Sequence, residues 1–317
     1  MNMECRICSN TSNLNKYLVK EMMFGLREEF EYFQCPNCEC LQIVNFPKDM
    51  AKYYPSNYYS FTKDKKSVIS IISGWMKSRR NRFAMFDNDM LGWLIHSIFP
   101  SVNPSFNAIV LADAHKTHKI LDVGCGSGYF LKNLAKIGFK NLHGVDPFLN
   151  ENLIEEQGVR LEKKSIHQVK SKKDIITFNH SFEHLSDPLE TLKMVSDIMN
   201  PGGQCIIRIP TVSSYAWKHY GVNWVQLDAP RHFFLHSIKS VKYLANQVNL
   251  TVENVVYDSN EFQFLGSERY IKNIPLRSKE KNKDIFSNSE IKSFKSRAKK
   301  LNYENKGDAI AVFLRKP

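Results

Sequence analysis

The sequence predicts a doubly wound α/β fold, and three observations lead to that prediction. From His118 onward, short apolar segments alternate with amphipathic ones, the pattern of strands and helices in a parallel sheet. One apolar segment, 120–123, runs straight into a glycine-rich turn and then into a helical pattern. The chain has 317 residues, enough for one large domain of this kind and a small accessory one.

The N-terminal third is predicted to hold two regions that differ from this core. Residues 1–46 indicate short strands and turns around five cysteines, which would form a small module. Residues 47–110 form a linker that is rich in tyrosine up to Ser60 and becomes helical after it. Apolar residues recur at helical spacing between 63 and 98, which predicts two helices that end before Pro100.

The remaining residues, 111–317, are predicted to form the core domain. The segment 259–306 interrupts the last pair of strands, and its polar, lysine-rich composition predicts a helical insertion over one end of the sheet. The apolar runs predict strands at 119–124, 141–145, 159–161, 174–178, 203–209, 251–257 and 309–314. The amphipathic runs between them predict helices at about 128–137, 149–157, 187–199 and 238–248.

The chain carries a formal net charge of +12, and the excess lies in two segments that flank the core. Counting Lys and Arg against Asp and Glu, residues 61–101 come to about +4 and residues 271–303 to about +7. Such segments either bind the phosphates of a nucleotide-sugar, a nucleic acid or an anionic membrane, or they form solvated helix faces that bind no ligand. The charge alone does not decide between these alternatives.

No stretch of the sequence approaches the ~20 apolar residues that span a bilayer. The best candidate, 91–99, contains His96. The N-terminus lacks a basic region followed by an apolar run, which argues against a secretory signal. We therefore expect a cytoplasmic protein without a transmembrane segment, and leave peripheral membrane contact open.

Four of the seven cysteines form two Cys-x-x-Cys pairs, Cys5 with Cys8 and Cys35 with Cys38. Each such turn presents two thiolates on one side, and two turns complete a tetrahedral sulfur site for zinc. An odd number of cysteines in a cytoplasmic chain argues against a disulfide framework, and redox chemistry is the rival interpretation. Because four thiolates close the site, we expect a structural zinc, with Cys40 as a bystander or alternative ligand.

The most informative stretch is the glycine-rich turn D-V-G-C-G-S-G, in which Gly124, Gly126 and Gly128 follow Asp122. Glycines let the backbone turn sharply and approach a ligand, and the next helix points its N–H groups at the turn. Eighteen residues after Gly128, the second strand ends at Asp146, where a carboxylate accepts the ribose hydroxyls of a bound nucleoside. The turn alone is weak evidence, because dehydrogenases use a related one.

Together these residues closely resemble the glycine-rich motif and second-strand acid of class I methyltransferases that use S-adenosylmethionine (SAM). The resemblance covers roughly residues 105–258 and 307–317, and it implies a Rossmann-like, seven-stranded methyltransferase sheet. It also implies that the glycine turn holds the methionine part of SAM and that Asp146, followed by Pro147, holds the ribose. A dehydrogenase turn and a degenerate fold without activity are the alternatives.

Two other positions match this family less closely. Ser165 and Ile166 stand where family members contact the adenine ring, but the acid that many of them carry there is missing. The fourth strand ends in Asn179 and His180, and an E-H pair follows at 183–184, as in small-molecule methyltransferases. The segment differs from the N-P-P-Y motif of enzymes that methylate amino groups. The resemblance implies that Asn179 lines the SAM site and His180 points into its cleft.

The loop after the fifth strand is the predicted acceptor side. It places Asp228, Arg231 and His232 among aromatic residues, beyond the carboxyl end of a strand, where α/β sheets bind ligands. This loop, the N-terminal cysteines and the Tyr58-Tyr59-Ser60 segment resemble methyltransferases of bacterial surface-polysaccharide and deoxysugar biosynthesis. The sugar C-methyltransferases among them have a further C-terminal domain that this sequence lacks, so we expect O-methylation of a sugar or sugar-derived small molecule.

A sugar hydroxyl needs a base to become a good nucleophile. His232 is our first candidate for that base and His180 our second. Asp228 would orient the histidine or bind a hydroxyl, and Arg231 would hold a phosphate or carboxylate of the acceptor, which is a nucleotide-linked or lipid-linked sugar. Alternatively, Asp228, Arg231 and His232 simply tie the loop to the sheet edge.

Two other functions compete with this one. Some rRNA enzymes also carry an N-terminal zinc knuckle, so an rRNA or tRNA methyltransferase is one alternative. However, the cysteine module is slightly acidic and the basic segments contain few aromatics for base stacking, so we do not expect a nucleic-acid partner. The other alternative is a non-catalytic SAM-binding partner protein, against which the intact glycines and Asp146 argue.

Overall fold

The computed structural model describes residues 3–54, 68–87, 89–100, 103–156 and 158–317. Tyr58, Tyr59 and Ser60 lie outside these residues. The chain divides into two compact units. Unit one comprises Met1–Tyr54, His180–Lys193 and Ile207–Leu314, and unit two comprises Pro55–Asn179, Met194–Ile206 and Arg315–Pro317.

Unit two is built on a sheet with the strand order β9-β8-β4-β5-β7-β6. The pairs β4–β5, β4–β8 and β5–β7 are parallel, as predicted, and β6 runs antiparallel to β7, so the sheet is mixed. The strands are β4 Lys119–Val123, β5 Asn141–Val145, β6 Leu153–Glu156, β7 Val159–Glu162, β8 Lys173–Asn179 and β9 Met199–Pro210. The last of these, β9, continues from unit two into unit one at Ile207.

The prediction of a helix at 149–157 is wrong, because strand β6 lies within that segment. Leu153 pairs with Glu162 and Ile154 with Leu161, so the backbone is extended. Gly158 has a φ of +78°, a left-handed conformation that glycine adopts freely and that allows a tight reversal between β6 and β7. The segment also has few apolar residues at helical spacing, so the amphipathic signal was weak.

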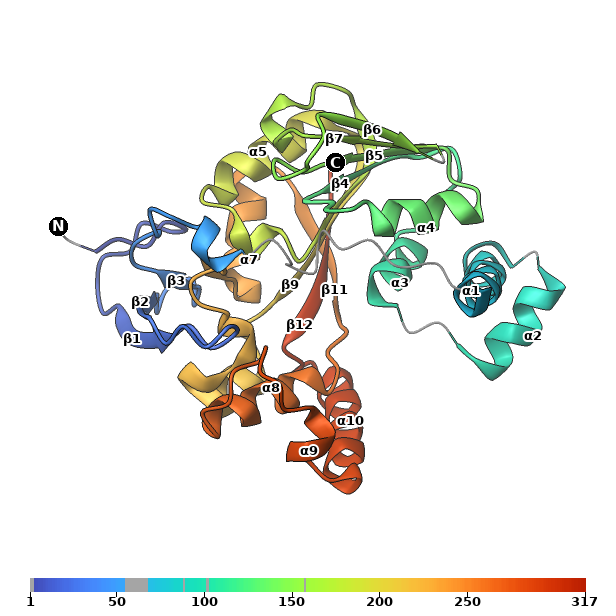
Figure 1. Ribbon diagram of the computed structural model, residues 1–317. Coiled ribbons are helices and arrows are strands. Elements are labelled where there is room, and N and C mark those ends of the chain that lie inside the picture. Colours follow the sequence, from blue (N-terminus) through green and yellow to red (C-terminus); the bar gives the residue numbers. More distant parts are fainter. Residues whose placement is uncertain (1–2, 55–67, 88, 101–102, 157) are drawn as a thin grey trace. The chain divides into compact units, whose positions relative to one another are not determined.

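Helices α1 Val68–Phe86 and α2 Met90–Ile98 confirm the two helices predicted from the apolar spacing of this region. They lie next to each other in unit two (Figure 1). The carboxylate of Asp89 caps α2 by accepting a hydrogen bond from the Gly92 N–H at 2.8 Å. The further helices of this region are α3 Pro104–Leu111 and α4 Tyr129–Ile137, and α5 Pro188–Ile198 runs from unit one into unit two.

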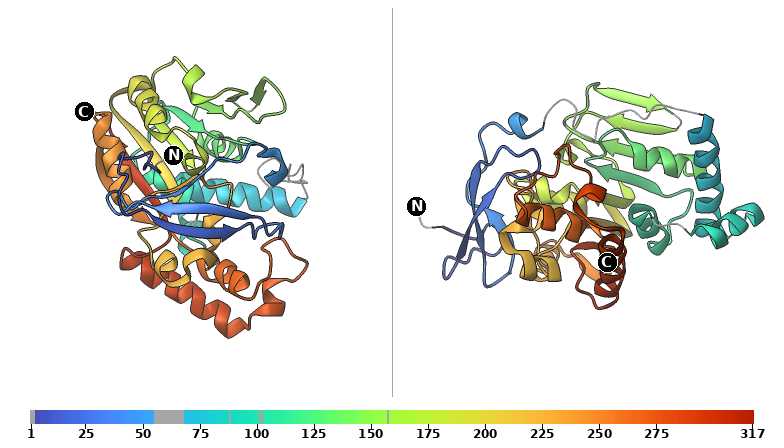
Figure 2. Two further views of the ribbon diagram at one scale, coloured as in Figure 1. Left: turned by 90° about the vertical axis from the view of Figure 1, so that its left-hand side faces the viewer. Right: turned by 60° about the horizontal axis from the view of Figure 1, so that its bottom comes forward.

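Unit one contains an antiparallel sheet that joins the N-terminal segment to the predicted acceptor loop. Its strand order is β1-β2-β3-β10, and β1 and β2 form the long hairpin drawn in dark blue in Figure 2. The strands are β1 Asn15–Lys20, β2 Glu29–Gln34, β3 Leu41–Ile43 and β10 Phe234–Leu235. Because β10 begins two residues after His232, the sheet fixes the end of that loop.

Helices α8, α9 and α10 occupy the segment 259–306, where the sequence predicts a helical insertion. Its buried residues share one hydrophobic core with Val19 and Tyr32 of the N-terminal strands and Trp224 of the acceptor loop. The insertion therefore stabilises unit one, which contains both the N-terminal strands and the acceptor loop. The elements are α6 Tyr215–Tyr220, α7 Ile238–Gln247, β11 Thr251–Tyr257, α8 Phe262–Ile271, α9 Asn282–Ile285, α10 Asn288–Tyr303 and β12 Ala309–Arg315, and the strand order here is β11-β12-β9.

Short 3-10 helices complete the fold at Ala51–Tyr53, Ile166–Gln168, Phe182–His184, Gly221–Asn223 and Val225–Leu227. Every strand predicted from the sequence is present, and the architecture is the α/β fold expected of a class I methyltransferase. Strand β6 adds an eighth strand to the seven-stranded sheet that the resemblance implies. Among the described helices, none combines the length and the apolar character that crossing a bilayer requires.

Candidate active site

The glycine-rich turn of unit two has the backbone that its sequence predicts. Gly124, Gly126 and Gly128 all have positive φ angles, of 74°, 50° and 72°, which side chains with a Cβ rarely adopt. A Cβ at Gly128 would lie 2.6 Å from the Cδ1 of Leu161. The absence of a Cβ at Gly128 therefore allows the turn to pack against Leu161, and helix α4 begins directly after the turn, as the predicted SAM site requires.

Asp146 fixes this turn and still has acceptor capacity for a ribose. Its Oδ2 accepts a hydrogen bond from the Gly126 N–H at 3.0 Å, and its Oδ1 accepts one from the Phe148 N–H at 2.9 Å. Each carboxylate oxygen has a second lone pair. These residues fit the predicted SAM site, in which Asp146 would accept the ribose hydroxyls.

Asp122 is buried and lies at the end of β4. Its Oδ1 accepts hydrogen bonds from the Thr177 hydroxyl at 2.7 Å and from the Asn179 amide at 3.0 Å. Burial, opposed by these two hydrogen bonds, raises the pKa of Asp122 to about 6. Asp122 and Asn179 therefore link the ends of β4 and β8, and the structure brings these two SAM-site candidates together.

The remaining SAM-site candidates belong to the same unit. Ser165 caps the short helix 166–168 in a capping box, because its N–H donates to the Gln168 side chain at 3.0 Å. Ile166 is buried and Pro147 is exposed directly after Asp146. Neither Ser165 nor Ile166 is charged, so the assignment of these two residues to the adenine stays a prediction.

The four cysteines of the paired motifs come together in unit one. Their sulfur atoms all lie within 4.8 Å of one another, with Cys5–Cys38 at 3.5 Å and Cys8–Cys35 at 3.6 Å. Zn–S bonds of about 2.3 Å in a tetrahedron require sulfur atoms roughly 3.8 Å apart, so the donor set fits zinc. No disulfide forms among these cysteines, and Cys40 lies outside the cluster.

Amide side chains surround this cysteine cluster and favour thiolates. Gln42 donates to the Cys5 sulfur at 2.9 Å, Asn37 to Cys8 at 3.5 Å and Asn10 to Cys35 at 3.6 Å. Such donors stabilise negative charge on sulfur and orient the ligands of a metal site.

The cysteine module also holds the acceptor loop. The Ser237 hydroxyl donates to the Cys38 carbonyl at 2.5 Å, and the Tyr32 hydroxyl donates to the His232 carbonyl at 2.9 Å. The Ile43 N–H donates to the Phe233 carbonyl at 3.0 Å. The N-terminal module is therefore part of the framework that positions residues 232–237.

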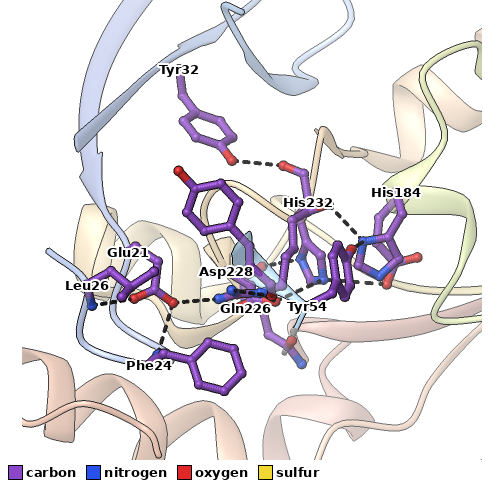
Figure 3. A network of polar contacts seen from close by, with 12 residues as sticks. Glu21, Phe24, Leu26, Tyr32, Tyr54, His184, Gln226, Asp228 and His232 are labelled. Atoms are coloured by element: carbon purple, nitrogen blue, oxygen red, sulfur yellow. Dashed lines mark hydrogen bonds and ion pairs between the residues drawn. The ribbon is translucent and has the colours of Figure 1, made fainter. Parts of the chain in front are cut away.

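Arg231 forms ion pairs with Asp228 and Glu21, both of which Figure 3 labels. It forms a bidentate ion pair with Asp228, with distances of 2.9 and 2.6 Å, and a further ion pair with Glu21 at 3.0 Å. Its Nη1 donates to the Tyr53 carbonyl at 3.3 Å, and the side chain is fully buried. The acceptor phosphate expected at Arg231 has no access to it. Arg231 and Asp228 instead tie the acceptor loop to the N-terminal module.

His232 lies beside this ion pair with a fixed ring orientation (Figure 3). Its Nδ1 is 2.7 Å from the Gln226 carbonyl, so Nδ1 carries the proton and Nε2 is the free acceptor. Nε2 is 3.9 Å from Asp228 and 4.0 Å from Glu183, and only 8% of the side chain is exposed. Burial and the nearby His184 lower the pKa of His232 to about 4.

Glu183 is the residue that the sequence interpretation did not place in the site. Its carboxylate is fully buried and, within the described residues, has no hydrogen-bond partner. Burial opposes its ionisation, but His180, His184 and His232 surround it and lower its pKa to about 2. The E-H pair after the fourth strand was the available signal. Glu183, His184 and His232 also bring ligand atoms within 4.8 Å of one another, as a divalent metal would require.

His180 differs from His232 in being open to solvent. Its side chain is 42% exposed, and its Nδ1 lies 3.5 Å from the Glu183 Oε1. The residue has a φ of +54°, and its N–H donates to the Arg208 carbonyl at 2.9 Å, which fixes the backbone. A half-exposed imidazole backed by a buried carboxylate is the arrangement of a histidine–acid pair in general-base catalysis.

A sequence model described as a methyltransferase domain matches residues 92–255, a little over half of the chain. The chain belongs to this methyltransferase family. This methyltransferase is 28% identical over 157 residues to a ubiquinone biosynthesis O-methyltransferase of Pseudomonas fluorescens, covering 44% of this chain and 66% of that protein. It is 28% identical over 102 residues to a tRNA U34 carboxymethyltransferase of Campylobacter hominis, covering 28% of this chain and 35% of that protein. The chain thus spans about a third to two thirds of these curated relatives.

Solved methyltransferase structures are also similar to this chain. A SAM-dependent methyltransferase from Mesorhizobium loti has 13% sequence identity and a TM-score of 0.44, covering 68% of this chain and all of that one. A possible histamine N-methyltransferase from Thermotoga maritima has 18% sequence identity and a TM-score of 0.44, covering 75% of this chain and all of that one.

Proposed function

We propose that this methyltransferase transfers the methyl group of SAM to a hydroxyl of a sugar or sugar-derived small molecule in bacterial surface-polysaccharide biosynthesis. The observation that carries the proposal is the pairing of His180 with the buried Glu183, directly after the SAM-site residue Asn179 in the chain. A base of this kind is needed for an alcohol acceptor. The O-methyltransferase named among the relatives supports oxygen as the acceptor atom.

The donor side of the proposal rests on unit two. The backbone of Gly124, Gly126 and Gly128 would hold the methionine part of SAM, and Asp146 would accept the ribose hydroxyls. SAM supplies a methyl group on a sulfonium, which is already activated for displacement. The protein's own task is to align the acceptor oxygen with that methyl group and to remove its proton.

The acceptor side rests on unit one, where we assign the base to His180 and give His232 a positioning role. His180 is the more exposed ring, and Glu183 would stabilise the imidazolium that forms on it. With SAM bound, the acceptor oxygen would bond to the methyl carbon, and the sulfur would keep the electron pair of the broken carbon–sulfur bond. The hydroxyl proton moves to His180 and is later released to solvent, so charge and atoms balance.

We also propose that Cys5, Cys8, Cys35 and Cys38 hold one structural zinc. Four thiolates leave no open coordination position, so the metal takes no part in methyl transfer. Its role would be to stabilise the module that carries Glu21 and Tyr32 and thereby the acceptor loop. The seven free cysteines favour a reducing compartment, and we place the reaction in the cytoplasm.

The test is a methyl-transfer screen with SAM labelled in its methyl group. The acceptors are nucleotide-sugars, lipid-linked glycans, a catechol as a ubiquinone-type acceptor, and tRNA. We expect label on a sugar oxygen, identified by the chemical shift of an O-methyl group in the NMR spectrum of the product. Methylation of tRNA or of the catechol alone would overturn the sugar assignment, and SAM binding without turnover on any acceptor would favour a non-catalytic partner protein.

A further inference from the structure

Helix α2 exposes a broad apolar surface in unit two. Exposed fractions are 90% for Met90, 55% for Trp93 and 62% for Ile98. Large apolar residues that are exposed together mark interaction sites, whereas single ones are common on any protein. We call these residues the α2 apolar surface: Met90, Leu91, Trp93, Leu94, Ile98 and Phe99.

The opposite face of α2 is already used for packing against α1 (Figure 1). A Cβ on Gly92 would collide with the carbonyl oxygen of Arg79, so the two helices approach closely there. Arg79 also forms an ion pair with the helix cap Asp89 at 2.9 Å. The orientation of α2 on α1 is therefore fixed, and its apolar surface stays outside.

A cationic cavity adjoins this surface. It has a volume of about 420 Å³, and Arg79, Arg82 and Lys116 line it together with the single acid Asp89. Met90 and Leu91 line it as well, so the apolar surface continues into its wall. The Nε of Arg82 is buried and, within the described part of the chain, has no hydrogen-bond partner. A buried donor of this kind calls for an acceptor from a ligand.

We propose that α2 docks on the surface of an anionic membrane, with a lipid phosphate in the Arg79–Arg82–Lys116 cavity. A phospholipid matches both features of this region. Its apolar chains would contact Trp93 and the rest of the α2 apolar surface, and its phosphate would bind the cations of the cavity. Tryptophan prefers the depth at which these two parts meet. With three cations against one acid, the cavity favours an anionic occupant over a second copy of this basic chain.

This inference goes beyond the proposed function, since membrane docking does not depend on which acceptor is methylated. The test uses the full-length protein and two kinds of vesicle, phosphatidylcholine alone and phosphatidylcholine mixed with phosphatidylglycerol. We expect sedimentation with the anionic vesicles only, at least tenfold stronger at low salt than at high salt, and a blue shift of tryptophan emission on binding. An absence of vesicle binding by protein that still binds SAM would overturn the proposal.

Three variants locate the binding surface. The double variant Trp93→Ser/Leu94→Ser should bind the anionic vesicles at least tenfold more weakly, and Arg82→Gln should lose most of the preference for phosphatidylglycerol. Ile271→Ser, which removes an equally exposed apolar side chain from α8, should bind like the unmodified protein. Equal binding by the double variant would refute the proposal. So would a protein dimer that dissociates in the double variant, because the surface would then contact a second copy.

Discussion

Arg231 and Glu21 form an ion pair in which both side chains are fully buried, with 3.0 Å between Nη2 and Oε1. They are 210 residues apart in the sequence. Glu21 also accepts hydrogen bonds from the N–H groups of Phe24 and Leu26, each at 2.9 Å. The pair therefore joins the turn between β1 and β2 to the acceptor loop.

Replacing Glu21 by Gln should destabilise the protein by roughly 3–5 kcal/mol, the usual cost of leaving one partner of a buried ion pair uncompensated. The new amide would also turn a donor toward backbone N–H groups that need an acceptor. Thermal unfolding measures the effect. Glu29→Gln is the control, because Glu29 is exposed and 3.7 Å from Lys20, and it should change stability by no more than about 1 kcal/mol. A similar effect of both variants would show that the buried pair adds little.

Protein purified without chelators should contain one zinc per chain. Cys35→Ser should lower the zinc content and the melting temperature far more than it changes SAM affinity, because the metal is structural. Cys40→Ala is the matched control, since Cys40 is buried beside the cluster but is not one of its four sulfurs. Less than about half an equivalent of zinc in the unmodified protein, or zinc loss only in Cys40→Ala, would disprove this ligand set.

Asp146→Ala should weaken SAM binding at least tenfold. Hydrogen bonds to a charged group contribute roughly 1.5–3 kcal/mol each, and the variant would lose those to the ribose as well as the one that fixes Gly126. Titration calorimetry measures the dissociation constant, and Asp113→Ala, at an exposed carboxylate, controls for the loss of charge. An unchanged dissociation constant for Asp146→Ala would mean that the ribose lies elsewhere.

The parts of the fold that could be predicted are those determined by local pattern. Strand β4 and its glycine turn could be predicted from a few adjacent residues. The apolar run predicts the strand in which Ile120 and Leu121 are buried, and the glycines predict the turn in which Gly124 has a positive φ. The cysteine spacing likewise identifies its cluster. Strand β6 was missed because its pairing with β7, rather than its own periodicity, makes it a strand.

The acceptor side could be predicted only in part, since its contacts join distant segments. The sequence indicated Arg231 but not its partner Glu21, and without that partner a buried arginine looks like a substrate ligand. The same applies to Glu183, whose importance comes from the rings of His180 and His232 around it. Burial and long-range pairing are properties of the fold, and no short motif encodes them.

The last prediction separates the two candidate bases. His180→Asn should lower turnover about 10²–10⁴-fold with SAM affinity nearly unchanged, because the proton acceptor is lost. Asparagine is chosen because it tolerates the positive φ at this position. His232→Ala should retain turnover within about tenfold of the unmodified enzyme, as expected of a positioning residue.

The pH dependence of turnover gives an independent readout of the same question. A neutral imidazole is the base, so turnover falls as the pH drops through the pKa of that imidazole. Burial lowers the pKa of His232 to about 4, so an acid limb near pH 4 would identify His232 as the base. More than a third of normal turnover in His180→Asn, together with a loss in His232→Ala, would assign the base to His232.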